Sequence, residues 1–96
     1  MTTLAIVKEK LRNHQLDLSS RFGLSKMAIF GSYGRGQQRT DSDIDILVEF
    51  NRPIGLEFID LAEELERILG ERVDLVSRNG IKASYFREIE AELTYV

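Results

Sequence analysis

The sequence predicts an α/β (α+β) fold, a small mixed sheet of three to four strands flanked by helices. Two observations carry most of this prediction. From Asp43 to Phe50 the residues largely alternate between apolar and polar, which is the period of a strand with one buried face. Residues 56–69 then repeat apolar side chains at the period of a helix. A connecting helix of that length allows the strands on either side of it to be parallel neighbours.

The chain opens with a predicted helical segment, residues 3–22. Its apolar residues fall on one stripe, while lysine, arginine and glutamate side chains lie outside it. His14 and Gln15 interrupt the stripe, so a break into two short helices near Asn13 is expected. Gly23 is a suitable C-terminal stop. The stripe consists of Leu4, Val7, Leu11, Leu18 and Phe22.

The middle of the chain is predicted to hold two strands and the clearest helix. Residues 26–30 and 44–50 are the strands, and a turn containing proline follows at residues 51–55. Residues 56–69 form an amphipathic helix that ends at Gly70.

The last quarter of the chain is predicted to add a strand and a helix. Residues 72–77 form the third strand, and an Asn-Gly turn at residues 79–80 separates it from a helix over residues 82–91. We expect Tyr85, Phe86 and Ile89 of this helix to face the core. Residues 93–96 form a short extended tail.

The composition limits the classes of function. With 96 residues, 43% of them hydrophobic and 30% charged, the chain supports a single domain over residues 1–96. The absence of cysteine excludes a thiolate metal site and fits the cytoplasm, and no apolar run approaches the roughly 20 residues of a membrane helix. A net charge of −3 disfavours direct contact with nucleic acid, so neither a membrane nor a nucleic-acid partner is expected.

Two acids stand at the start of the second strand. Asp43 and Asp45 are two residues apart, so in a strand their carboxylates point to the same side. Two carboxylates held this close repel each other unless a cation lies between them, and hard divalent cations prefer oxygen ligands. The pattern therefore predicts a metal site, the alternative being a solvated strand end with two turn-type acids.

A glycine-serine turn ends the first strand. At Gly31 the backbone can approach a ligand closely, and the Ser32 hydroxyl can bond a phosphate oxygen. Free backbone N–H groups at such a turn favour an anion. The turn predicts a phosphate cradle facing the metal site, the alternative being a plain tight turn. Tyr33 follows directly and is expected either in the pocket or on the surface.

Asp74 is the one charged residue inside the apolar stretch of the third strand. If the third strand lies beside the second, Asp74 is about 5 Å from it across the sheet. Three acids would then converge where the cradle points, an arrangement that suits metal-assisted phosphoryl chemistry. The alternative is a sheet-edge ion pair of Asp74 with Arg72 or Arg78.

The chain resembles the minimal nucleotidyltransferase family of the DNA polymerase beta superfamily. The resemblance covers essentially the whole chain and implies the palm-like nucleotidyltransferase fold. Gly34 departs from the family, which usually carries alanine before the arginine. The motifs are Gly31-Ser32, Arg35-Gly36, Ser42-Asp43-Ile44-Asp45 and Val73-Asp74-Leu75-Val76.

The resemblance implies a role for each motif residue. ATP would be the nucleotide donor and Mg²⁺ the metal. Asp74 would be the third metal ligand, or the group that helps deprotonate the acceptor hydroxyl. Arg35 would steady the phosphates or the acidic loop, the alternative being a simple ion pair with Asp41. The implied groups are Gly31, Ser32 and Arg35 for nucleotide binding, Ser32, Asp43, Asp45 and Asp74 for catalysis, and the three aspartates for the metal.

Small stand-alone members of this kind resemble the antitoxins of HEPN–MNT toxin–antitoxin pairs. The resemblance implies transfer of AMP from ATP to a tyrosine hydroxyl of a HEPN-type RNase, which silences that toxin. The alternative is an antitoxin that blocks its partner by stoichiometric binding and occlusion, with little catalysis. A small-molecule nucleotidyltransferase is disfavoured because such enzymes generally need an added substrate domain.

Overall fold

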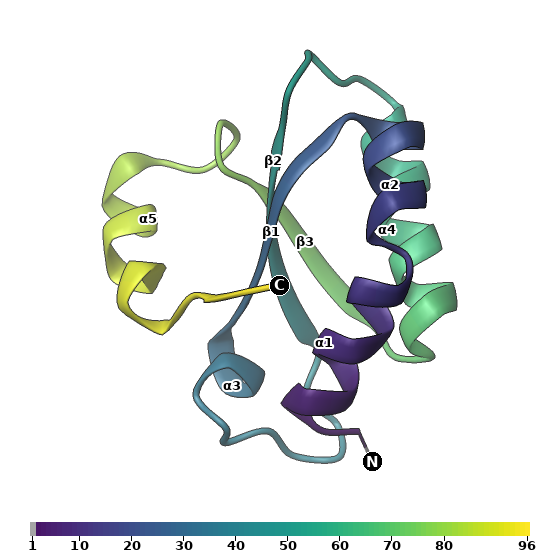
Figure 1. Cartoon of the computed structure of the whole chain (residues 1–96). Helices are drawn as coiled ribbons and strands as arrows, with labels where there is room; N and C mark the ends of the chain where they lie inside the picture. Colours follow the sequence, from purple (N-terminus) through teal and green to yellow (C-terminus); the bar gives the residue numbers. More distant parts are fainter. Residues whose placement is uncertain (1) are drawn as a thin grey trace.

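The computed structural model describes residues 2–96 and confirms the predicted mixed sheet (Figure 1). Its four strands lie in the order β3-β2-β1-β4. β2 and β3 are parallel neighbours, as expected, while β1 pairs antiparallel with both β2 and β4. The predicted C-terminal tail thus contributes a short edge strand. The strands are β1 (Leu24–Phe30), β2 (Ile44–Phe50), β3 (Val73–Ser77) and β4 (Thr94–Tyr95).

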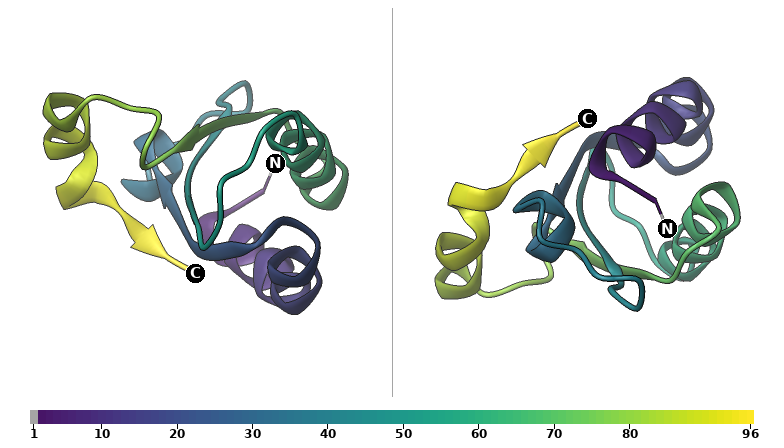
Figure 2. Two further views of the ribbon diagram at one scale, coloured as in Figure 1. Left: turned by 90° about the horizontal axis from the view of Figure 1, so that it is seen from above. Right: turned by 90° about the horizontal axis from the view of Figure 1, so that it is seen from below.

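Helices cover both faces of this sheet. α1, α2 and α4 lie on one face and α5 lies on the other, as the views from above and below also show (Figures 1 and 2). Within residues 2–96, no helix has both the length and the apolar character needed to cross a bilayer. The helices are α1 (Leu4–Asn13), α2 (Gln15–Phe22), α3 (Gly31–Gly34), α4 (Glu57–Leu69) and α5 (Ala83–Ile89), followed by the 3₁₀ turn η1 (Glu90–Glu92).

The expected break in the first helical segment falls at His14. Its φ of −109° lies outside the helical range, and its ring nitrogen Nδ1 is 2.9 Å from the carbonyl oxygen of Lys10. The second helix ends at Gly23, where a φ of +68° reverses the chain into β1. The two helices therefore present one apolar stripe, with Val7 and Leu18 fully buried.

The alternation in β2 separates two cores. Ile44, Ile46 and Val48 are fully buried and pack with residues of α1, α2 and α4. Leu47 points to the opposite face, where it forms a smaller cluster with Phe30 and Ile89 beneath α5. Asp45, two residues before Leu47, shares that second face. The sheet face covered by α5 therefore carries the predicted site.

Candidate active site

Asp45 and Asp74 are direct partners across the parallel strands β2 and β3. Each follows an apolar residue of the larger core, Ile44 and Val73 respectively, so the two carboxylates share the opposite face. Partial burial, and next the negative charge of Asp74, raise the pKa of Asp45 from 3.8 to about 6. A bound cation would stabilise the charged form of a carboxyl group whose pKa is raised in this way.

Asp43 lies just before β2 and contributes to this repulsion. Its charge also raises the pKa of Asp45, while its Oδ1 lies 3.5 Å from Nε of Arg72. Arg72 therefore pairs with Asp43 and not with Asp74, and the guanidinium of Arg78 lies over the ring of Phe86 at 3.7 Å. The alternative of an ion pair between Asp74 and either arginine is wrong.

The three aspartates do not form a closed metal cage in this arrangement. Within residues 2–96, no three histidine, cysteine, aspartate or glutamate side chains stand close enough together to hold a metal ion. Asp43 and Arg72 are both well exposed, and exposed side chains change rotamer within nanoseconds. The Asp43 carboxylate can therefore leave Arg72, and the ligand set of three aspartates stays a prediction.

The turn at Gly31 brings backbone directly against Asp45. Gly31 has a φ of +68°, and a Cβ built on it would collide with Oδ2 of Asp45 and lie 2.9 Å from its Cγ. The left-handed conformation and the missing side chain are thus both required here. The antiparallel register explains the proximity, because Phe30, the last residue of β1, is paired with Asp45.

An open pocket of about 590 Å³ lies above this turn. The phosphate-binding residues predicted from sequence, Gly31, Ser32 and Arg35, all line it, together with Asp43 and Asp45. Asp74 flanks the pocket through Asp45 and does not itself line it. The remaining lining residues are Phe30, Ser42, Tyr85, Glu88, Ile89 and Glu92.

Glu92 is a site residue that the sequence did not reveal. Nη1 of Arg35 donates to Oε2 of Glu92 at 2.9 Å, and the backbone N–H of Gly31 donates to Oε1 at 3.2 Å. The expected alternative of an Arg35–Asp41 pair is therefore wrong. Because Glu92 is separated from Arg35 by 57 positions, only the folded C-terminal turn brings the two together.

Tyr85 and Tyr33 both lie elsewhere than the sequence predicted. Tyr85, expected in the core, is 40% exposed and lines the pocket, where burial and then the charges of Asp45 and Asp74 raise its pKa. Tyr33 is only 2% exposed and belongs to the larger core. Helical spacing could have indicated the exposure of Tyr85. Phe86 and Ile89 pack on the sheet at positions i and i+3, so Tyr85 lies off the buried face of the helix.

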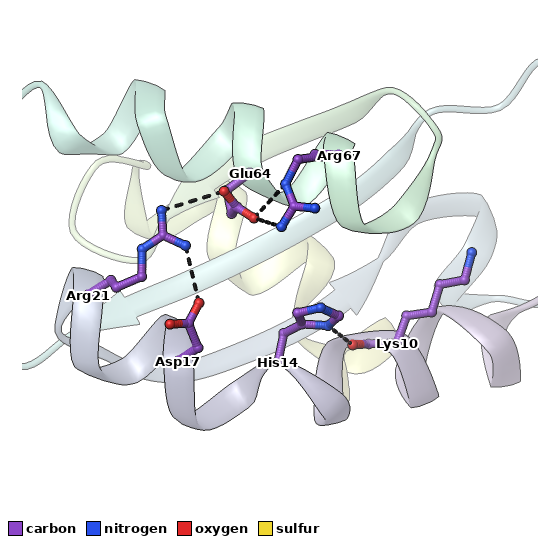
Figure 3. A network of polar contacts seen from close by, with 6 residues as sticks. All are labelled: Lys10, His14, Asp17, Arg21, Glu64 and Arg67. Carbon is purple, nitrogen blue, oxygen red and sulfur yellow. Dashed lines mark hydrogen bonds and ion pairs between the residues drawn. The ribbon is translucent and has the colours of Figure 1, made fainter.

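A second open pocket, also of about 590 Å³, lies on the opposite side of the sheet between α2 and α4. Three of its charged side chains form ion pairs with one another: Arg21 binds Glu64 at 3.5 Å, and Glu64 also binds Arg67 (Figure 3). Arg21 also binds Asp17 of its own helix at 3.1 Å. The Arg21–Glu64 pair ties α2 to α4. Because this pocket lies on the sheet face opposite the one that carries Asp45 and Asp74, it is separate from the predicted site.

Known proteins are similar to this chain in sequence and in structure. A family profile described as a nucleotidyltransferase domain matches residues 11–96. The protein adenylyltransferase MntA of Thermococcus cleftensis is 43% identical over 97 residues, which is all of this chain and 98% of the relative.

Two solved structures show the same arrangement of helices and strands. One, described as a candidate minimal nucleotidyltransferase, superposes with a TM-score of 0.81 at 34% identity and covers 97% of this chain and 95% of its own. The other is the complex of a tri-AMPylated HEPN toxin with an MNT antitoxin from Shewanella oneidensis. It superposes with a TM-score of 0.71 at 21% identity over 97% of this chain and 71% of that one. At that identity the second likeness shows the fold alone.

Proposed function

Because the chain belongs to the nucleotidyltransferase domain family, we propose that it transfers AMP from ATP to a tyrosine hydroxyl of a HEPN-type RNase toxin. The transfer neutralises the toxin and makes this protein its antitoxin. One arrangement carries the proposal: Asp45 stands opposite Asp74 while the Gly31 backbone packs against Asp45. The similarity to a protein adenylyltransferase along the whole chain supports the reaction class.

The donor set fits magnesium. Asp43, Asp45 and Asp74 offer carboxylate oxygens, which hard divalent cations prefer, and the raised pKa of Asp45 marks a place where positive charge is needed. When bound, the metal would neutralise phosphate charge and lower the pKa of the attacking hydroxyl. The three aspartates are the residues that would hold it.

The remaining residues bind and orient the substrates. The Gly31 N–H, the Ser32 hydroxyl and the Arg35 guanidinium bind oxygens of the triphosphate. Attack of the tyrosine oxygen on the α-phosphorus forms one P–O bond and breaks the bond to the β-phosphate oxygen, so pyrophosphate leaves. To Asp74, the more exposed of the two paired acids, we assign either the third metal position or acceptance of the hydroxyl proton.

The acceptor arrives on another protein. Within residues 2–96, every helix and strand belongs to the sheet or to the layers covering it, and none forms a separate acceptor-binding unit. The pocket is open to solvent beside Tyr85 and Glu88, which leaves room for a partner's side chain. The fold shared with the antitoxin of the Shewanella oneidensis complex supports a HEPN partner. We further propose that the two proteins meet in the cytoplasm.

The direct test is adenylylation of that partner in vitro. The protein is incubated with magnesium, ATP and its HEPN-type partner, and the partner is read by intact mass. We expect the mass of one or more AMP groups, lost in Asp43→Asn/Asp45→Asn and retained in Asp41→Asn, whose exposed side chain lies outside the pocket. An unmodified partner held in a tight complex would contradict the transferase and favour occlusion instead.

A further inference from the structure

The carboxylate of Glu92 binds the same hydrogen-bond donors, on Gly31 and Arg35, that the proposed function assigns to the triphosphate. Its two oxygens accept hydrogen bonds from separate donors, one from the Gly31 N–H at 3.2 Å and one from Nη1 of Arg35 at 2.9 Å. The Glu92 side chain is only 22% exposed. A carboxylate with one donor on each oxygen presents the same charge and acceptors as two oxygens of a phosphate.

A close backbone approach holds Glu92 in this position. A Cβ at Gly34 would lie 2.8 Å from the carbonyl oxygen of Glu92 and 3.1 Å from that of Ile29, so a side chain at this position would push the two segments apart.

The segment carrying Glu92 is held on its C-terminal side by few bonds. β4 contains only Thr94 and Tyr95, which pair with Ile29 and Ala28 at the edge of the sheet. The N–H of Val96 adds one bond to the carbonyl oxygen of Met27 at 3.0 Å. A strand of this length contributes little stability by itself, so the turn can move without unfolding the sheet.

We propose that Glu92 is an internal competitor for the triphosphate. In the nucleotide-free protein its carboxylate neutralises Arg35 and accepts the hydrogen bond of the Gly31 N–H. ATP binds after η1 has moved away from these two groups. The inference rests on the proposed function, which supplies the phosphate-binding role of Gly31 and Arg35. It adds that the C-terminal turn sets the affinity for nucleotide, because only the fraction with Glu92 withdrawn can bind.

The test is calorimetric titration of ATP with magnesium into the whole chain. Glu92→Gln keeps the size of the side chain and removes its charge, and Glu90→Gln is the matched control on the same turn, exposed and absent from the pocket lining. We expect Kd to fall about tenfold in Glu92→Gln, which corresponds to about 1.4 kcal/mol, because the competing charge-assisted hydrogen bonds are weakened. Glu90→Gln should stay within about twofold of the wild type.

A second variant tests the same competition without touching Glu92. Gly34→Ala should displace the Glu92 backbone and tighten ATP binding in the same direction. The amide resonance of Gly31 gives an independent readout: in Glu92→Gln it should shift before any nucleotide is added. Melting curves of both variants verify that the sheet is folded.

The outcomes distinguish a failure of the Glu92 competition from a failure of the proposed function. If the wild type binds ATP and Glu92→Gln binds it equally or more weakly, Glu92 is no competitor, and the proposed function stands without it. If neither the wild type nor any variant binds ATP, the phosphate-binding role of Gly31 and Arg35 is wrong, and both proposals fall together.

Discussion

Asp45 makes the active site costly to the folded protein, and replacing it by asparagine should raise stability while removing activity. The pKa of this carboxyl is raised from 3.8 to about 6 in the folded chain. Each pKa unit corresponds to about 1.4 kcal/mol, so the full shift sets an upper limit of about 3 kcal/mol. Because Asp45 is only half-buried, solvent screening reduces the expected gain to about 1–2 kcal/mol.

The pH dependence follows from the same shift. Between pH 4 and pH 6 the folded state holds a proton on Asp45 that the unfolded chain has released, so the free energy of unfolding falls as pH rises through this window. Above pH 6 the full cost is present. The Asp45→Asn variant lacks this group, so its gain over the wild type should be absent near pH 4 and complete at pH 8.

Urea unfolding of both proteins from pH 4 to pH 8, without divalent metal, measures this difference directly. At pH 8 the gain corresponds to a rise in Tm of about 4–8 °C per kcal/mol for a domain of this size. Asp41→Asn, on an exposed loop, is the control and should change stability by less than about 0.5 kcal/mol. A variant no more stable than the wild type at pH 8, or a gain that is the same at all pH values, would mean that the Asp45 charge does not destabilise the folded protein.

Three further substitutions test the turn and the surface. Gly31→Ala should cost about 1–2 kcal/mol for the left-handed φ and more for the collision with Asp45, whereas Gly36→Ala, with φ +71° and nothing within 4 Å, should show the backbone cost alone. Equal losses in chemical denaturation would mean that Gly31 does not press on the acid. Arg21→Ala breaks the pair with Asp17 within α2 and the pair with Glu64 of α4, and should cost less than about 1 kcal/mol, a loss that shrinks in 1 M salt. A larger loss that does not depend on salt would mean that these pairs contribute more than exposed ion pairs do.

The sequence predicted most of the fold because its signals are local and strong. The alternation after Asp43 defines β2 with its observed bounds, and the apolar repeat of residues 56–69 gives α4 to within one residue. The parallel pairing of β2 and β3 followed from the length of the helix between them, and it placed Asp74 beside Asp45 as expected. Features that depend on periodicity or on connection length were therefore predictable.

Contacts between distant segments were not predictable in this way. The positions of Glu92 and Tyr85 at the pocket depend on how α5 lies across the sheet and where η1 turns, and no periodicity encodes either. The predicted alternative partner of Arg35 was wrong for the same reason. Asp41 is near Arg35 in the sequence, whereas Glu92 is near it in the folded structure. Ends of elements and loop-borne charges require the tertiary structure.

The register of β2 and β3 makes correct folding a check on the site. The alternation that buries Ile46 and Leu75 on one side is the alternation that aligns Asp45 with Asp74 on the other. A slip of β3 by one residue would move Asp74 to the apolar face of the sheet and move its aliphatic neighbours, such as Leu75, out of the core. A chain with the wrong register between β2 and β3 therefore lacks both its core and its acid pair. No stably folded form should exist in which the core is intact and Asp45 and Asp74 are apart.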